Sequence, residues 1–139
     1  MTARCFADTN LLLYAASKDP ADESKKAVAR ALLAAEDIGL SAQVLQEFAH
    51  NATAKRRLGL EAQETETILH ALLAYPVLPV TGELVLEAFA LQQRYQISYW
   101  DAAIIAAARA LGCEVLYTED LNAGQEYAGV MVRNPFAQA

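Results

Sequence analysis

Short apolar segments alternate with helical patterns along this sequence, and the alternation restricts the fold more than any other feature. Five short apolar segments are typical of buried strands: residues 4–7, 38–41, 77–80, 114–118 and 130–133. Five longer segments have the spacing or end signals of helices: one that opens in residues 18–24 and runs to about 36, then 42–55, 61–74, 82–96 and 101–111. This order predicts an α/β fold in which helices cover both faces of a parallel sheet. Because Pro79 has no N–H to donate, the strand at 77–80 is expected near a sheet edge.

Length and composition predict one small folded domain. A chain of 139 residues can bury a single core, so we expect one domain over residues 1–139. Hydrophobic residues make up 55% and charged residues 20%, which excludes a disordered chain. The first residues lack the apolar core of a signal peptide and no apolar run is long enough to cross a bilayer, so a cytoplasmic protein is expected. Cys5 and Cys113 have no CxxC spacing, and we expect two buried thiols.

Four acidic residues lie at or near places where such sheets bind ligands. Ligands of an open parallel sheet bind beyond the carboxyl ends of its strands. Asp8 and Asp120 each follow a predicted strand, whereas Glu47 and Asp101 lie on predicted helices. Each acid alone has an ordinary structural explanation. Asp8 can cap a turn, Asp120 can begin one, Glu47 can be solvated, and Asp101 stands at capping-box spacing from Ser98.

Taken together, the same four acids favour a metal site. If the strands that carry Asp8 and Asp120 are neighbours, their carboxylates meet at one crevice, where like charges disfavour each other unless a cation intervenes. Oxygen ligands without histidine or cysteine favour Mg²⁺ or Mn²⁺ over zinc. Such an ion can orient and polarise a phosphodiester and lower the pKa of a bound water.

The segments around these acids resemble the four acidic motifs of PIN domains, and they look most like the VapC toxins of bacterial toxin–antitoxin pairs. The matching segments are FADTNLLLY at 6–14, LQEF at 45–48, SYWDAAI at 98–104 and LYTEDLN at 116–122. The resemblance runs from about Phe6 to Phe136 and includes the closing GVMVRNPF at 129–136. It implies a PIN-like three-layer α/β/α sandwich with a five-stranded parallel sheet in the order 3-2-1-4-5.

The resemblance also implies an activity and a set of site residues. The activity is endonucleolytic cleavage of RNA by a metal-activated water, with Mg²⁺ or Mn²⁺ as the cofactor. The acidic set that it carries over is Asp8, Glu47, Asp101 and Asp120, of which Asp8, Asp101 and Asp120 are the expected metal ligands. Asn10 and Thr118 match supporting polar residues that hold waters or carboxylates in place. A homodimer and a VapB-like antitoxin partner that covers the acidic pocket are expected as well.

Some positions near the motifs have more than one interpretation. Glu119 is adjacent to Asp120, and we predict that Asp120 faces the metal because strand alternation puts it on the same side as Thr118. Trp100 can stack on a base, but a buried aromatic at a helix start is commoner. His50 lies one helical turn after Glu47, and a surface or interface histidine is expected there rather than a catalytic base.

The net charge of −6, from 11 basic and 17 acidic residues, argues against nucleic-acid binding. The objection is weakened because more than half of the basic residues fall in two clusters: Lys25, Lys26 and Arg30, and Lys55, Arg56 and Arg57. The site carboxylates also account for much of the negative charge, and a bound divalent ion offsets part of it. A basic rim around an acidic pocket is therefore compatible with this composition.

Other functions fit the sequence less well. A phosphohydrolase of the haloacid dehalogenase type needs a second Asp two residues after the first, where this chain has Asn10. A phosphoacceptor signalling domain needs an acidic pair after the first strand and a lysine after the last, and neither is evident. The remaining alternative is a catalytically inactive PIN-like module that binds a protein partner or RNA, and the full acidic set argues against it.

Overall fold

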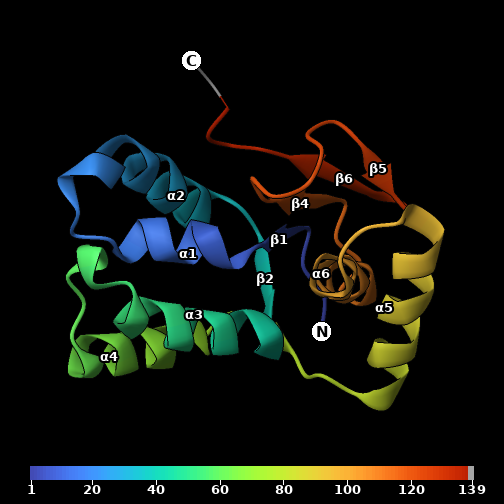
Figure 1. Cartoon of the computed structure of the whole chain (residues 1–139), viewed down its shortest axis with the longest axis horizontal. Coiled ribbons are helices and arrows are strands. Elements are labelled where there is room, and N and C mark those ends of the chain that lie inside the picture. Colours follow the sequence, from blue (N-terminus) through green and yellow to red (C-terminus); the bar gives the residue numbers. More distant parts are fainter. Residues whose placement is uncertain (138–139) are drawn as a thin grey trace.

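A six-stranded sheet forms the centre of the protein (Figure 1). The computed structural model describes residues 1–137. The strands are β1 (Cys5–Ala7), β2 (Ile38–Ser41), β3 (Val77–Leu78), β4 (Val115–Tyr117), β5 (Glu126–Tyr127) and β6 (Val130–Arg133), in the order β3-β2-β1-β4-β6-β5. All neighbours pair in parallel except β5 and β6. Every residue of β1, β2 and β4 is buried, as expected for strands covered on both faces.

The predicted order 3-2-1-4-5 is confirmed for the five strands that the sequence pattern indicated, and β3 lies at an edge as expected. The prediction of five parallel strands was wrong in one respect, because β5 adds a sixth, antiparallel strand at the other edge. This strand has only two residues and follows a polar loop, so it has no recognisable alternation. Its turn to β6 consists of Ala128 and Gly129, both with positive φ (50° and 94°), as in the tight turns that favour hairpins.

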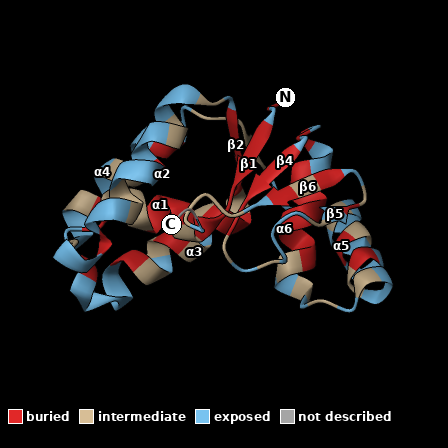
Figure 2. Ribbon diagram, turned by 90° about the horizontal axis from the view of Figure 1, so that it is seen from above, coloured by how far each residue is buried: buried red, intermediate tan, exposed pale blue. Residues whose placement is uncertain are grey.

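Within residues 1–137, six α-helices cover the sheet, four on one face and two on the other (Figure 2). The first group contains α1 (Thr9–Ala16), α2 (Glu23–Ala35), α3 (Ala42–Ala54) and α4 (Ala62–Leu72), with short 3-10 turns η1 (Pro20–Asp22) and η2 (Arg56–Leu58). The second contains α5 (Gly82–Tyr95) and α6 (Tyr99–Ala110). The sequence pattern did not indicate α1, because its Leu11-Leu12-Leu13 run is buried throughout and lacks an amphipathic period.

Side-chain caps determine where the helices that carry site residues begin. Ser41 ends β2 and caps α3 directly, accepting a hydrogen bond from Val44 N at 3.2 Å. Ser98 caps α6 in the same way and accepts from Asp101 N at 3.1 Å. Such caps satisfy backbone donors that the first helical turn leaves unpaired. They therefore fix where α3 and α6 begin, and Ser41 joins the start of α3 directly to β2.

Small residues allow close packing around the sheet. In α6, residues 102–108 are all buried, and most of them are alanine. An ideal Cβ on Gly39 in β2 would come within 2.8 Å of both Ala3 Cβ and Leu111 Cδ1, so a side chain there would collide with its neighbours. Cys5 and Cys113 are buried free thiols, as predicted. Among the described residues, no helix is both long enough and apolar enough to cross a membrane.

Candidate active site

The carboxyl ends of the neighbouring strands β1 and β4 meet at the base of the candidate site. The two strands pair in parallel, with Ala7 opposite Tyr117, and Asp8 N donates to Tyr117 O at 3.1 Å. Asp8 and Thr118, the next residue on each strand, are thereby brought together. The Thr118 hydroxyl donates to Asp8 Oδ2 at 2.7 Å. The strands that carry the first and last predicted acids are neighbours, which is the condition for a shared crevice.

Asp8 is both a helix cap and a member of the acidic cluster. Its Oδ1 accepts from Thr9 N at 2.7 Å at the start of α1, and only 7% of the residue is exposed. Burial raises the pKa of Asp8 to about 6, with the charges of Asp120 and Glu47 adding to the rise and the hydrogen bonds from Thr118 and Thr9 opposing it. The capping role and the cluster are therefore compatible, and the buried charge makes the site favourable for a cation.

Asp120 is held from two sides. Its backbone N–H donates to Thr118 Oγ1 at 3.1 Å, and the Asn10 side-chain amide lies 3.4 and 3.3 Å from Asp120 Oδ1 and Oδ2. Burial raises the pKa of Asp120, and the negative charges of Asp101 and Glu119 raise it further. The two predicted supporting residues, Asn10 and Thr118, thus make direct hydrogen bonds to the carboxylates at either end of the cluster.

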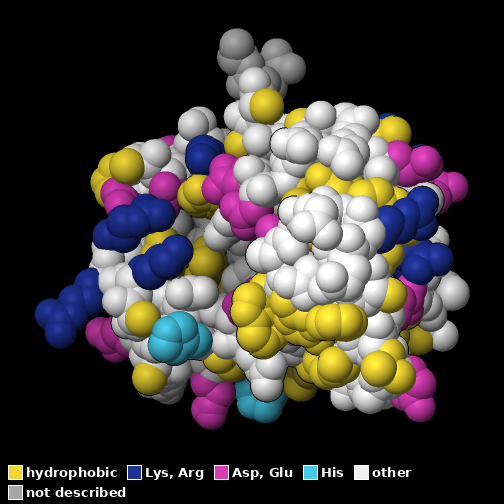
Figure 3. Space-filling model, turned by 45° about the vertical axis from the view of Figure 1, so that its right-hand side comes forward, with side chains coloured by type: hydrophobic (Ala, Val, Ile, Leu, Met, Phe, Trp, Pro, Cys, Tyr) yellow, Lys and Arg dark blue, Asp and Glu magenta, His cyan; other side chains and the backbone are white. Residues whose placement is uncertain are grey.

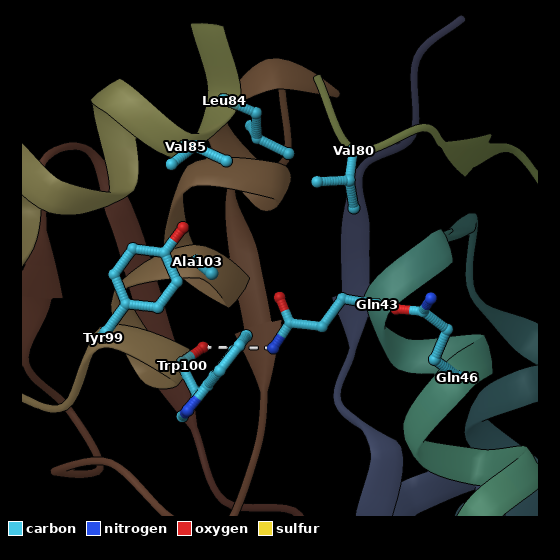
Figure 4. A pocket seen from close by; sticks show the side chains of 8 residues that line it. All are labelled: Gln43, Gln46, Val80, Leu84, Val85, Tyr99, Trp100 and Ala103. Atoms are coloured by element: carbon cyan, nitrogen blue, oxygen red, sulfur yellow. Dashed lines mark hydrogen bonds between the residues drawn. The ribbon is translucent and has the colours of Figure 1, made fainter. Parts of the chain in front are cut away.

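Glu47 reaches the cluster from the middle of α3. Its Oε1 accepts from the Thr9 hydroxyl at 2.6 Å. Gln43, one turn earlier on α3, places its amide 3.5 Å from Glu47 Oε2 and 3.4 Å from the Trp100 carbonyl oxygen (Figure 4). Gln43 therefore connects α3 to the first turn of α6, which carries Asp101.

All four predicted acids line one cavity of about 160 Å³. Its lining residues come from the start of α1, from α3, from α6 and from the loop after β4: Asp8, Thr9, Asn10, Glu47, Asn51, Trp100, Asp101, Ile104 and Asp120. Figure 3 shows acidic side chains in a strip beside a hydrophobic surface. Four segments that are far apart in the sequence thus place carboxylates around one space.

Glu119 is directed away from this cavity, although it is adjacent to Asp120. Its Oε1 accepts from the Tyr14 hydroxyl at 2.7 Å, and its Oε2 lies 3.1 Å from Lys25 Nζ. Of the two adjacent acids, Asp120 lines the cavity and Glu119 does not line it. This arrangement agrees with the alternation argument that placed Asp120 on the side of Thr118.

The donor set fits a hydrated Mg²⁺ or Mn²⁺ ion and does not fit a structural zinc ion. The cavity offers carboxylate and amide oxygens, without a histidine or cysteine among its lining residues. Within residues 1–137, no three acidic, histidine or cysteine side chains lie close enough together to form a ready-made metal cage. Mg²⁺ usually keeps several waters and binds proteins through one or two carboxylates. The open arrangement of acids therefore suits an ion that is only partly coordinated by protein.

Some residues of the cavity were not indicated by the sequence, and one expectation about a neighbour was wrong. Thr9 and Asn51 line the cavity and were not predicted, although Asn51 stands four residues after Glu47, the spacing of one helix face. Gln43, which contacts Glu47 from beside the cavity, was not predicted either. Trp100 was expected to be buried, but it is 64% exposed at the edge of the cavity. It also borders an adjoining groove of about 340 Å³ that includes His50, which is exposed as expected.

Comparisons with known proteins give one family and one fold. The sequence model of the PIN domain family matches residues 5–126. A chain of a toxin–antitoxin complex from Klebsiella pneumoniae superposes with a TM-score of 0.71 at 21% identity, covering 95% of this chain and 98% of that one.

Two further solved structures have the same fold. VapC20 of Mycobacterium tuberculosis, described as a toxin that cleaves the sarcin–ricin loop, gives a TM-score of 0.66 at 24% identity, covering 84% of this chain and 89% of its own. FitAcB of Neisseria gonorrhoeae gives a TM-score of 0.67 at 18% identity, covering 96% of this chain and 99% of its own. No curated protein sequence matches the chain.

Proposed function

Because this chain belongs to the PIN domain family, we propose that it is a divalent-metal-dependent endoribonuclease. PIN domains are generally nucleases, that is, hydrolases. One observation carries the proposal: four acidic side chains from four separate segments line one cavity that offers only oxygen donors. Ion-pairing or solvation would explain acids at the surface, but neither explains a buried Asp8 beside Glu47 and Asp120.

The proposed roles follow from the position of each side chain around the cavity and from its hydrogen bonds where it makes them. Asp8, Asp101 and Asp120 would hold Mg²⁺ or Mn²⁺, directly or through its water ligands. When bound, the ion supplies positive charge to the phosphodiester and acidifies a water molecule. Glu47, oriented by the Thr9 hydroxyl, is suited to accept a proton from the attacking water. Thr118 and Asn10 hold Asp8 and Asp120 in place through the hydrogen bonds described above.

Removal of the metal gives the first prediction. Purified protein is expected to cleave single-stranded RNA internally in Mn²⁺ or Mg²⁺, to lose cleavage in EDTA, and to regain it when Mn²⁺ is added in excess. Gel analysis of a labelled RNA of defined length measures this. RNA binding without cleavage under every metal condition would favour the alternative, an inactive PIN-like module that binds RNA or a protein.

A toxin function is the finer proposal, and the similarity of the fold to toxin–antitoxin structures supports it. An antitoxin that covers the cavity would meet carboxylates, so a basic side chain is the expected contact. Expression of the chain alone is expected to stop cell growth, and co-expression with a small protein encoded next to its gene should restore growth. Normal growth with abundant protein that is active on RNA in vitro would contradict the toxin proposal.

Self-association is proposed from a group of exposed apolar side chains. Val85, Leu86 and Phe89 of α5 are 43%, 73% and 56% exposed, and Val80 and Trp100 beside them are 51% and 64% exposed. Figure 4 shows Val80, Val85 and Trp100 around one small pocket. Apolar residues gathered in this way are typical of protein interfaces.

Leu86→Asp is therefore expected to convert a homodimer into a monomer, because it places a charge in the apolar contact. Sedimentation of the two proteins at equal concentration measures the change. Leu73→Asp, at an exposed apolar position at the end of α4, is the control and should leave the mass unchanged. A wild-type protein that sediments as a monomer at high micromolar concentration would refute the homodimer.

A further inference from the structure

Two adjacent acids in the loop after β4 make contacts on opposite sides of that loop. Asp120 lines the acidic cavity and receives hydrogen bonds from Asn10. Glu119 binds the Tyr14 hydroxyl at 2.7 Å and Lys25 Nζ at 3.1 Å. Because the two carboxylates are adjacent in one short loop, we expect a change in the contacts of Glu119 to alter the orientation of Asp120.

Lys25 is itself held by several groups. Its Nζ lies 3.1 Å from the Tyr14 hydroxyl oxygen and 4.6 Å from the centroid of the Tyr14 ring. The same Nζ lies 5.5 Å from the ring centroid of Phe136, which packs edge-on against Tyr14 at 5.0 Å. We refer to Tyr14, Lys25, Glu119 and Phe136 as the Glu119 clamp. The clamp joins α1, α2, the loop after β4 and the C-terminal segment.

The contacts of Glu119 and Lys25 are less exposed and more numerous than those of an ordinary surface ion pair. An exposed pair contributes roughly 0–1 kcal/mol because water screens it and two flexible side chains must be ordered. Here the side chain of Glu119 is 22% exposed and that of Lys25 39%, and a hydroxyl and two aromatic rings share the contact. Cation–π contacts and hydrogen bonds to a charged group both limit the motion of the lysine.

We propose that Tyr14 and Lys25 are positioning residues of the proposed metal site. By holding Glu119 on the outer side of the loop, they keep Asp120 turned into the cavity and keep a fifth carboxylate out of it. The positioning role rests on the proposed function, since it requires that the cavity bind a divalent ion. A clamp with a purely structural role would instead stabilise the loop without affecting the binding of that ion.

Two variants of the full-length protein test the positioning role. Lys25→Met keeps the length of the side chain and removes its charge, and Tyr14→Phe removes only the hydroxyl. Mn²⁺ binding, measured by isothermal titration calorimetry, is expected to weaken about 10-fold or more in Lys25→Met and by less in Tyr14→Phe, as for other residues that orient metal ligands. RNA cleavage should fall at low Mn²⁺ and recover at high Mn²⁺, while KM for RNA stays constant.

Two matched variants serve as controls. Lys25→Arg keeps the positive charge beside Glu119 and is expected to retain most of the Mn²⁺ affinity. Lys26→Met removes a charge from the next position of α2, where no ion pair is found within the described part of the chain, and should bind Mn²⁺ like the wild type.

The outcomes separate the positioning role from the proposed function. If the wild type binds Mn²⁺ and cleaves RNA, but both test variants have wild-type Mn²⁺ affinity, the positioning role is wrong, whatever their melting temperatures. If the wild type neither binds Mn²⁺ nor cleaves RNA, the proposed function fails and the positioning role fails with it. Weaker Mn²⁺ binding in Lys25→Met, with normal binding in Lys26→Met, supports the positioning role.

Discussion

Replacing Asp8 with asparagine is expected to lower RNA cleavage by at least about 100-fold, because the loss of a metal ligand should exceed the roughly 10- to 100-fold effect of removing a residue that only orients one. The fold should be retained. Asparagine has the same shape, its Oδ1 can still accept from Thr9 N, and its amide can donate to the Thr118 hydroxyl. Initial rates with labelled RNA at saturating Mn²⁺, together with circular dichroism, measure both effects.

The control for Asp8→Asn is a carboxylate at the opposite end of the same pair of strands. Glu114 precedes β4 and forms an exposed ion pair with Arg4, far from the acidic cavity. Glu114→Gln should cleave RNA at the wild-type rate. Cleavage by Asp8→Asn at a rate within a few-fold of wild type would remove Asp8 from the metal site, provided that the variant is folded.

The second large effect is expected from Leu116→Ala, which removes a fully buried side chain from β4, two residues before Thr118. A cavity at this position should lower the free energy of unfolding by about 3–5 kcal/mol. That loss corresponds to a fall in the melting temperature of about 10 °C or more for a chain of this size. Urea unfolding followed by circular dichroism measures the change in free energy.

Leu73→Ala is the matched control for this stability measurement. Leu73 is also a leucine but is 60% exposed, so its truncation should change the free energy of unfolding by less than about 0.5 kcal/mol. Equal losses in the two variants would contradict the assignment of β4 to the centre of the core.

Several parts of the fold can be predicted from local sequence patterns. The parts that could not be predicted are determined by contacts between residues that are distant in the sequence. Short apolar segments predict the five strands, and helical spacing and end signals predict most helices. The order of the strands comes from the resemblance to PIN domains. Helix α1 was not indicated because its Leu11-Leu12-Leu13 run is buried and so lacks the polar face that marks a surface helix. Strand β5 was not indicated because two residues cannot display a period, and a hairpin turn with positive φ at Ala128 and Gly129 creates it.

In the candidate site, too, some features could be predicted from local sequence and others depend on distant contacts. Asp8 and Asp120 stand out because they follow strands, and the topology then brings them together. The orientation of Glu119 depends on Tyr14 and Lys25, which are 105 and 94 residues away in the sequence, so no local pattern reveals it. The exposure of Trp100 likewise depends on how α5 and α3 leave one side of it open, and helix-start statistics predict the opposite.

The location of Mn²⁺ in crystals soaked with that ion tests the central claim most directly, because its anomalous scattering identifies the metal without reference to activity. The proposed function predicts a peak in the cavity with oxygens of Asp8, Asp101 and Asp120 as direct or water-mediated ligands. A fully occupied Mn²⁺ elsewhere on the protein, with this cavity empty at saturating concentration, would contradict it.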